Sequence, residues 1–413
     1  MTQILEAYAK LAGEDVINQL GQLAERLKGL RVLHVNSTRL GGGVAEILNK
    51  LVPLMMELGM DATWEVITGD ESFFQCTKSL HNALQGNRIT IPGALFEAYE
   101  QANQRTAAEL GSLLEEADIV FIHDPQPAPL LSFCPKRRGK WIWRCHIDLS
   151  HPYRPVWKYF RRFLDDYDAS IFSLSDFAPT LPRPQYLIPP SIDPLSEKNI
   201  QLTEQEVQAV CGQFGLDSHR PLMLQVSRFD RFKDPVGVIQ AFRLARKYVP
   251  DLQLVLAGGG ASDDPEGALV RKEVEAFSEE DPDIHILELA ADAHRTINAL
   301  QHAADVVLQK SVREGFGLTV TEAMWKGKPV IGGNTGGIRL QIVNNHTGFL
   351  VNSPEGAALR VRYLFEHPDE LQEMGQKARE FVRENFLITR QLREYLTVIV
   401  ALTHGCQDRI ELG

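Results

Sequence analysis

The sequence predicts an α/β protein built from two doubly wound parallel sheets, each covered by helices on both faces. Short apolar runs alternate with amphipathic helical patterns along most of the chain, as expected when helices connect the strands of parallel sheets. The alternation breaks once, over the proline-containing stretch Leu187–Asn199, and such a stretch is typical of a linker between domains. The 413 residues are enough for two or three domains of roughly 150 residues each.

The expected elements follow one another in a simple order. A helical segment over about Ile4–Leu27 opens the chain, and strands then alternate with helices on both sides of the linker. The helix after the first strand has apolar residues at helical spacing from Val44 to Leu58, and it stops at Gly59. The strand candidates are short apolar runs, at Arg31–Val35, Ala62–Ile67, Asp118–Ile122, Trp141–Cys145, Ala169–Ser173, Leu222–Val226, Leu252–Leu256, Ile284–Leu287, Val306–Leu308 and Val330–Ile331.

The linker divides the chain into a first domain, residues 1–194, and a second domain, residues 195–387. A last apolar helix, at about residues 388–413, carries Leu392, Tyr395 and Leu396 at helical spacing, and we expect it to pack back onto the first domain. Open α/β sheets bind ligands beyond the carboxyl ends of their strands. If those ends face each other, the site is a central cleft between the domains. Residues that directly follow strands are therefore the first candidates for function.

Composition excludes several classes of protein. The chain has 43 basic and 54 acidic residues and a formal charge of −11, which argues against a general nucleic-acid binder but allows a local basic pocket for a small anion. No apolar run approaches the roughly 18 residues of a membrane span, and the N-terminus lacks the apolar core of a signal peptide. We therefore expect a cytoplasmic protein with neither nucleic-acid nor membrane partners. A homodimer is one open alternative for its assembly, on which the composition says nothing. Free thiols in a reducing compartment are expected at the five cysteines, which form no CxxC pair: Cys76, Cys134, Cys145, Cys211 and Cys406.

Three glycines, Gly41, Gly42 and Gly43, follow the first expected strand and open the next helix. Glycine lets backbone N–H groups approach an anion closely, and a helix N-terminus adds about half a positive charge. The run is neither GxGxxG nor a Walker motif, so it predicts a phosphate site without specifying a nucleotide. The alternative is a tight strand–helix turn with no ligand.

Two cations, Arg228 and Lys233, lie five residues apart in the loop after the expected strand Leu222–Val226. Fixed cations at the carboxyl end of a strand suit a diphosphate, whose charge must be neutralised as it leaves. The alternative is an ordinary solvated charged loop.

Two glutamates, Glu314 and Glu322, follow the expected strand Val306–Leu308. Glu314 lies in a Gly-Phe-Gly loop, and Glu322 lies in the helix that ends before Gly327. Carboxylates accept hydrogen bonds from sugar hydroxyls, and the free N–H groups of the loop could face phosphate. Glutamates at this spacing also occur by chance on charged helices.

Polar clusters also end two strands of the first domain. His123, Asp124 and Gln126 follow one strand, and the stretch from Arg144 to Asp148, which includes His146, ends the next. One alternative is a pair of buried structural histidines. A metal site at His146 and Asp148 is the other, but no third ligand stands at a diagnostic spacing. The Asp166/Asp168 and Asp281/Asp283 pairs resemble metal-binding DxD motifs and are interpreted as incidental.

Together these segments resemble the retaining GT-B glycosyltransferases of the glycogen-synthase-like family 4. The resemblance rests on Arg228 with Lys233, on the E-x7-E element from Glu314 to Glu322, and on the segments that follow. Those segments are Lys328–Ile331, Gly336-Gly337, and Met374-Gly375 through Ala378-Arg379 to Phe386.

The first half is similar, more narrowly, to trehalose glycosyltransferring synthases. This implies transfer of glucose from a nucleoside-diphosphate glucose (ADP-glucose or UDP-glucose) to free glucose, giving α,α-trehalose reversibly. The alternatives are a family 4 transferase with another acceptor, a longer trehalose phosphorylase that uses phosphate, a sugar-nucleotide epimerase and a non-catalytic sensor. The stretches that carry the resemblance are HVNSTRLGGGVAEIL, HNALQGN, VFIHDPQPAPL, WRCHIDLS and PPSIDPLSEKN.

The resemblance also implies roles for single residues. Glu322 would accept the ribose hydroxyls, Glu314 would bind the transferred glucose near C3 and C4, and His146 would lie beside the anomeric centre and contact the 6-hydroxyl. No obligatory cofactor and no protein metal site are implied, and magnesium would act as a stimulant at most. The donor diphosphate would be held by Arg228, Lys233, the backbone of Gly42 and Gly43, and the N–H groups of Phe316, Gly317 and Leu318. The second sugar would bind at Asp124, Gln126, Arg144 and Asp148.

Overall fold

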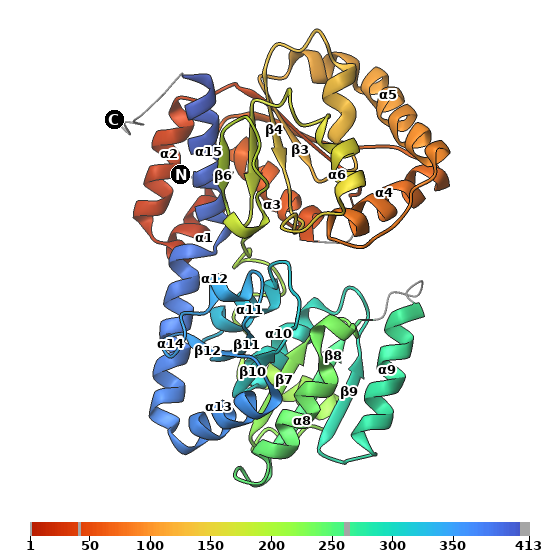
Figure 1. Cartoon of the computed structure of the whole chain (residues 1–413). Coiled ribbons are helices and arrows are strands. Elements are labelled where there is room, and N and C mark those ends of the chain that lie inside the picture. Colours follow the sequence, from red (N-terminus) through yellow and green to blue (C-terminus); the bar gives the residue numbers. More distant parts are fainter. Residues whose placement is uncertain (1, 40–42, 260–264, 405–413) are drawn as a thin grey trace. The chain divides into compact units, whose positions relative to one another are not determined.

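The computed structural model describes residues 2–39, 43–259 and 265–404 (Figure 1). The chain divides into two compact units, which we call the first unit (Met1–Pro190 with Ile388–Gly413) and the second unit (Ser191–Leu387). The sequence had placed this boundary between residues 194 and 195. Each unit contains one sheet of six parallel strands.

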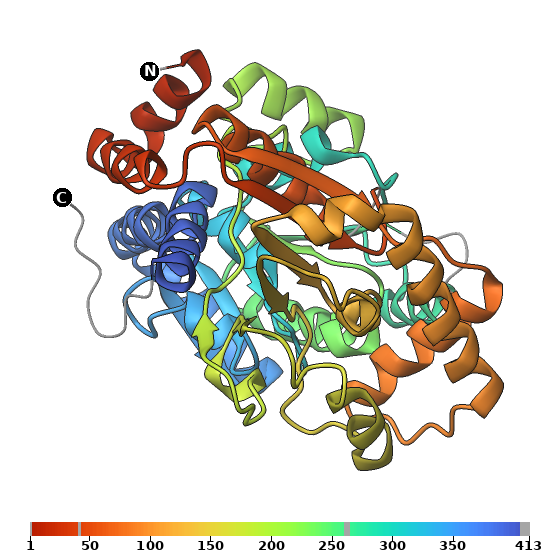
Figure 2. The same ribbon diagram turned by 90° about the horizontal axis from the view of Figure 1, so that it is seen from above.

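The sheet of the first unit has the strand order β2-β1-β3-β4-β5-β6. Its central strands are buried on both faces because helices cover both sides, which explains why they read as continuous apolar runs. Figures 1 and 2 show α4 and α5 on one side of this sheet and α2 and α15 on the other. The strands are β1 (Arg31–Asn36), β2 (Asp61–Val66), β3 (Ile119–His123), β4 (Lys140–Arg144), β5 (Ala169–Phe172) and β6 (Gln185–Leu187). The helices are α1 (Gln3–Ala12), α2 (Glu14–Glu25), α3 (Gly43–Glu57), α4 (Glu71–Leu84), α5 (Gly93–Glu116), α6 (Arg154–Arg161) and α15 (Ile388–Thr403), with the 3-10 helices η1 (Ala128–Phe133) and η2 (Ser175–Phe177).

The last described helix, α15, packs onto the first unit, as the sequence predicted. It lies beside α2 (Figure 1). Its Tyr395 ring stacks on Phe121 of β3 with 5.1 Å between the ring centroids. Arg393 donates a hydrogen bond of 2.7 Å to the side-chain oxygen of Gln19 in α2. The chain therefore returns to its first unit after completing the second.

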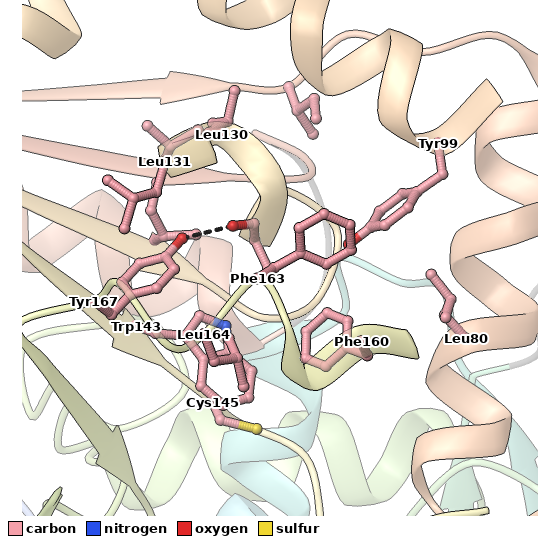
Figure 3. Packing of buried hydrophobic residues seen from close by; sticks show 14 of the residues in the cluster. Leu80, Tyr99, Leu130, Leu131, Trp143, Cys145, Phe160, Phe163, Leu164 and Tyr167 are labelled. Carbon is pink, nitrogen blue, oxygen red and sulfur yellow. Dashed lines mark hydrogen bonds between the residues drawn. The ribbon is translucent and has the colours of Figure 1, made fainter. Parts of the chain in front are cut away.

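Aromatic side chains pack among aliphatic ones in the hydrophobic core of the first unit (Figure 3). The Trp143 ring of β4 packs against Phe160 of α6 at 5.7 Å between centroids, and Tyr99 of α5 packs edge-on against Phe163 at 6.2 Å. The Trp143 indole N–H donates a hydrogen bond of 3.0 Å to the carbonyl oxygen of Asp124. The core thus anchors a residue that the sequence analysis placed in the site.

The sheet of the second unit has the strand order β12-β11-β10-β7-β8-β9. Helices α8 and α13 pack together against one side of it, with a core that includes Phe242 and Leu364. The strands are β7 (Leu222–Val226), β8 (Gln253–Gly258), β9 (Ile284–Glu288), β10 (Val306–Gln309), β11 (Val330–Gly333) and β12 (Gly348–Val351). The helices are α7 (Glu204–Gln213), α8 (Pro235–Ala245), α9 (Pro265–Ser278), α10 (His294–Ala303), α11 (Leu318–Trp325), α12 (Ile338–Gln341), α13 (Pro354–Glu366) and α14 (Pro368–Asn385), with the 3-10 helix η3 (Arg231–Lys233).

The observed elements confirm the predicted α/β class. Each expected strand overlaps an observed one, whereas β6 and β12 were not expected. The single helix predicted at the start is two helices, because Gly13 adopts φ +101° between α1 and α2. Within the described ranges, no helix combines the length and the apolar character needed to cross a membrane.

Candidate functional site

Two loops of the second unit bring a lysine and a glutamate into contact. Lys233 ends η3 after β7, and Glu314 follows β10, the neighbour of β7 in the sheet. Lys233 Nζ lies 2.6 Å from Glu314 Oε2, and the side chains are only 17% and 8% exposed. The pair therefore lies in a sheltered position at the carboxyl edge of the sheet, where folds of this kind bind ligands.

Neighbouring groups fix this pair from both sides. Ser311 Oγ donates a second hydrogen bond of 3.0 Å to Glu314 Oε2, and the Gln225 amide donates one of 2.8 Å to the Lys233 carbonyl oxygen. Glu314 Oε1 accepts no hydrogen bond from any described residue. Because an ionised carboxylate can accept on both oxygens, Oε1 is available to a hydroxyl of a ligand.

Glycines allow the Glu314 loop to lie against the loop after β11. Gly336 adopts φ +45°, and a Cβ atom there would lie 1.7 Å from the carbonyl oxygen of Glu314. A Cβ atom on Gly337 would lie 2.6 Å from Phe316 Cα, and the Gly337 N–H donates to the Gly315 carbonyl oxygen at 2.9 Å. A side chain on Gly336 would displace Glu314, and a side chain on Gly337 would displace Gly315 and Phe316 in the same loop.

The N-terminus of α11 presents open N–H groups next to Glu314. The N–H groups of Phe316, Gly317 and Leu318 donate to no acceptor among the described residues. Gln341 holds the loop by donating a hydrogen bond of 2.5 Å to the Phe316 carbonyl oxygen. Unpaired N–H groups at a helix N-terminus favour an anion, through both hydrogen bonding and the helix dipole.

Glu322, in the same helix, is buried, with 5% of its surface exposed. Its carboxylate accepts no hydrogen bond from the part of the chain that the structure describes. One turn later, Lys326 Nζ donates to the Glu322 carbonyl oxygen at 3.1 Å and to Asn199 Oδ1 at 3.2 Å. Burial lowers the pKa of Lys326 to about 7, an effect that the negative charge of Glu322 opposes. Glu322 thus offers acceptor oxygens in a sheltered place.

Arg228 differs from Lys233, although the sequence analysis treated them as a pair of equal cations. Its side chain is exposed, and its Nη2 lies 3.5 Å from Asp230 Oδ2. Asp230 also caps η3 by accepting a 2.7 Å hydrogen bond from the Phe232 N–H. Lys233 is held in one position by its partners, whereas Arg228 lies at the surface of the same loop.

In the first unit, Asp124 joins the ends of two neighbouring strands. It follows β3 with φ +65°, and its Oδ1 accepts a hydrogen bond of 2.7 Å from the backbone N–H of His146, which follows β4. Its own N–H donates to the Arg144 carbonyl oxygen at 2.8 Å. Aspartate tolerates this left-handed backbone better than most residues. Asp124 therefore positions the His146 loop.

The remaining acceptor candidates are unequal. Arg144 is fully buried; its Nη2 donates to Ser173 Oγ at 3.3 Å, while Nε and Nη1 have no partner within the described chain. Gln126 Oε1 is also buried, and no described residue donates to it. Asp148 is half-buried and accepts a hydrogen bond of 2.8 Å from the Ser150 N–H. Gln126 and Arg144 thus bring unsatisfied polar atoms to this end of the sheet.

The charge of Asp124 is expected to make stability depend on pH. Burial raises the pKa of this carboxyl to about 6, although the His146 N–H and the Arg144 charge lower it. The folded chain therefore binds this proton more tightly than the unfolded chain, so stability falls as pH rises from about 4 to about 6. Relative to Asp124→Asn, the free energy of unfolding of the wild type should fall by about 3 kcal/mol over this pH range. Urea unfolding of both chains across the pH series measures the difference, and parallel profiles would contradict it.

The glycine run that was predicted to bind phosphate is described only in part. Gly42 lies outside the described residues, and Gly43 is the first residue of α3.

Possible metal ligands and the cysteines can be stated briefly. Within the described ranges, no group of three or more His, Cys, Asp or Glu side chains could hold a metal ion. Four of the cysteines are described; all are buried, and none forms a disulfide: Cys76, Cys134, Cys145 and Cys211.

Sequence reasoning missed two features that shape the site. His34 lies within β1 and contacts His123, yet an isolated histidine in an apolar strand carried no motif. Lys310, at the end of β10, pairs with Asp234 at the start of α8. The signal available for both was a polar residue that interrupts a buried strand or follows it directly.

Two family profiles match the chain. The profile described as "Trehalose synthase, N-terminal domain" matches residues 34–179. The profile described as "Glycosyl transferases group 1" matches residues 211–381. The first range lies in the first unit, and the second lies in the second unit.

Similar proteins agree with these matches. The chain is 46% identical over 402 residues to the trehalose synthase of Pyrococcus horikoshii, with 96% of each chain covered. It is 30% identical to the trehalose phosphorylase of Pleurotus pulmonarius over 97% of this chain, but only 61% of the phosphorylase is covered. The solved α,α-trehalose 6-phosphate synthase of Burkholderia multivorans matches with a TM-score of 0.72 at 15% identity, covering 91% of this chain and 99% of that one. At that identity the match shows the fold alone, and it confirms the GT-B class.

Proposed function

Because this chain belongs to the trehalose synthase family, we propose that it moves glucose from a nucleoside-diphosphate glucose to free glucose, forming α,α-trehalose reversibly. The donor would be ADP-glucose or UDP-glucose, and the anomeric configuration would be retained. The observation that carries the proposal is the sheltered pair of Lys233 and Glu314 beside the open N–H groups of Phe316, Gly317 and Leu318. Together these groups offer a cation, oriented donors and a carboxylate at one place.

The cation and the N–H groups suit the donor diphosphate. As the bond from the anomeric carbon to phosphate oxygen breaks, negative charge grows on the leaving group, and fixed donors stabilise that charge in the transition state. Lys233 uses one N–H on Glu314 and keeps two that no described residue accepts. Arg228, whose side chain is exposed in the loop that also carries Lys233, is assigned to the same diphosphate.

The two glutamates suit hydroxyl groups of the donor. Glu314 Oε1 would accept from the transferred glucose near C3 and C4, since Oε2 is already taken by Lys233 and Ser311. Glu322 would accept from the ribose hydroxyls, because its carboxylate is sheltered and accepts from no described group. Carboxylates bind such hydroxyls through strong, charge-assisted hydrogen bonds.

The first unit supplies polar groups for the second sugar. We assign the acceptor glucose to Asp124, Gln126, Arg144 and Asp148, with His146 beside the anomeric carbon. In the proposed step the acceptor hydroxyl forms the new bond to that carbon on the face the leaving group departs from. Its proton passes to the phosphate oxygen that has just been released, so the step needs no further reactant.

Product analysis tests the proposal. The purified chain is incubated with glucose and, in turn, ADP-, UDP- and GDP-glucose, and the disaccharide is identified by NMR. We expect α,α-trehalose from at least one donor, and consumption of trehalose when a nucleoside diphosphate is added instead. EDTA should leave the activity in place, because the described chain offers no metal-binding cluster. Trehalose cleavage that requires orthophosphate and no nucleotide would contradict the proposal and identify a phosphorylase. Formation of a different disaccharide would show that glucose is not the acceptor.

A further inference from the structure

Three histidine rings form a chain of hydrogen bonds across three neighbouring strands of the first unit. His34 Nδ1 lies 3.0 Å from His123 Nε2, and His123 Nδ1 lies 3.1 Å from His146 Nε2. The strands that carry them, β1, β3 and β4, are adjacent in the sheet, and His146 follows β4 directly. His34 and His123 are almost fully buried, whereas His146 is partly exposed.

The lowered pKa values of the three rings favour their neutral forms at pH 7. Burial lowers the pKa of His34 to about 3, and burial together with the Arg144 charge lowers the pKa of His123 and His146 well below the usual range. A neutral imidazole has one N–H and one bare nitrogen. His123 makes a hydrogen bond with each of its nitrogens, so it must donate once and accept once. The chain can therefore run in one of two directions only, from His34 to His146 or the reverse.

The closed end of the chain favours one direction. His34 Nε2 is buried, and no described residue lies within hydrogen-bonding distance of it. If the hydrogen bonds ran from His146 to His34, His34 Nε2 would carry an N–H that is buried without an acceptor, and buried N–H groups without a partner are rarer and costlier in proteins than buried acceptors without one. If they run from His34 to His146, the unpaired His34 Nε2 is a nitrogen that carries no hydrogen. The proton of His146 then lies on Nδ1, because its Nε2 accepts from His123.

We propose that His34 and His123 are positioning residues that hold His146 as the Nδ1–H tautomer. The Nδ1 atom makes no hydrogen bond within the described chain and is not fully enclosed. It therefore offers a donor with a fixed direction to a substrate oxygen, and it cannot accept from a hydroxyl. This assignment of a sugar oxygen as the partner rests on the proposed function, whereas the tautomer itself does not.

Histidine NMR on the whole chain reads the tautomer directly. Long-range ¹H–¹⁵N correlations of the ¹⁵N-histidine protein, without substrate, distinguish a protonated Nδ1 from a protonated Nε2, and single variants assign the rings. His302 provides an internal reference, because its Nδ1 lies 3.0 Å from the Asn298 carbonyl oxygen, which can only accept. We expect His146 to show the same pattern as His302. A protonated Nε2 on His146 would overturn the proposal.

Variants test whether the two inner rings set this tautomer. His34→Asn puts an amide near the place of Nδ1 and should keep the His146 pattern, whereas His34→Leu and His123→Phe should give a mixture of tautomers. The exposed His219 of the second unit supplies the control, His219→Asn, which should remove only its own signals and change neither the His146 pattern nor the rate. In His123→Phe we expect kcat to fall about tenfold or more with a smaller change in KM for the donor.

The outcomes separate this proposal from the proposed function. An unchanged Nδ1–H pattern in His123→Phe would show that the inner rings do not set the tautomer. A wild type with the expected pattern that makes no trehalose would overturn the function and leave the tautomer assignment standing. If His123→Phe does not fold, the wild-type spectrum alone still decides the direction of the chain.

Discussion

Lys233→Met is expected to lower the turnover of glucosyl transfer by about 10²-fold or more while the fold is retained. Methionine keeps most of the length of the side chain and removes only the charge and its donors. The loss follows because Lys233 is the sheltered cation of the proposed diphosphate site, next to Glu314 and the open N–H groups of α11. Steady-state kinetics with the accepted nucleoside-diphosphate glucose measure it.

Stability needs its own measurement in this variant. Without Lys233, the mostly buried Glu314 carboxylate keeps Ser311 as its only partner among the described residues. An uncompensated charge in such a place costs about 3 kcal/mol or more in the free energy of unfolding. The double variant Lys233→Met/Glu314→Gln removes that charge, so it should recover stability without recovering activity. Recovery of both would mean that Lys233 serves the fold and not the donor.

The exposed Lys247 provides the matched control. Lys247→Met makes the same substitution in the same unit. It should leave the rate of transfer unchanged and alter the free energy of unfolding by no more than about 0.5 kcal/mol. Arg228→Ala should also slow transfer by about 10²-fold. Its stability should stay close to that of the wild type, because an exposed ion pair such as the one with Asp230 contributes little. Near-normal kinetics in either Lys233→Met or Arg228→Ala would remove the diphosphate assignment.

The fold could be predicted from the sequence where strands are buried on both faces. Strands such as β3 and β7 are continuous apolar runs, and their positions were predicted to within one residue. The two missed strands, β6 and β12, lie at the edges of their sheets. An edge strand pairs on one side only and can be partly exposed, so it needs fewer apolar residues. This explains why β6 was missed, whereas exposure does not explain β12, whose sequence GFLV is mostly buried. β6 has the sequence QYL, in which no residue is fully buried.

The site could be predicted residue by residue but not contact by contact. Motifs identified Lys233 and Glu314 separately, 81 positions apart, and nothing local indicates that they form an ion pair. The contact depends on β7 and β10 being neighbours in the sheet, and strand order is a property of the whole fold. The role of His34 could not be predicted for the same reason. Its partner His123 lies 89 positions away in the sequence, on the adjacent strand β3.

Gly336→Ala is the substitution with the second large expected effect, because it acts on the loop that holds Glu314. The added Cβ would lie 1.7 Å from the Glu314 carbonyl oxygen, far inside contact distance, and the backbone would keep a φ of +45° that alanine disfavours. One of the two loops must move. We expect the free energy of unfolding to fall by about 3 kcal/mol and transfer to fall by about 10²-fold, since a shift of about 1 Å in a positioning group is enough for that loss.

Two further variants separate the causes. Gly315→Ala adds a methyl group in the same loop where nothing lies within 4 Å, so its free energy of unfolding should match that of the wild type. Gly336→Asn tolerates the left-handed backbone but still carries a Cβ. If the clash with Glu314 dominates, Gly336→Asn will be as unstable and as inactive as Gly336→Ala. If Gly336→Asn regains both properties, backbone strain alone explains the requirement for glycine, and the close approach to Glu314 is not what sets the site.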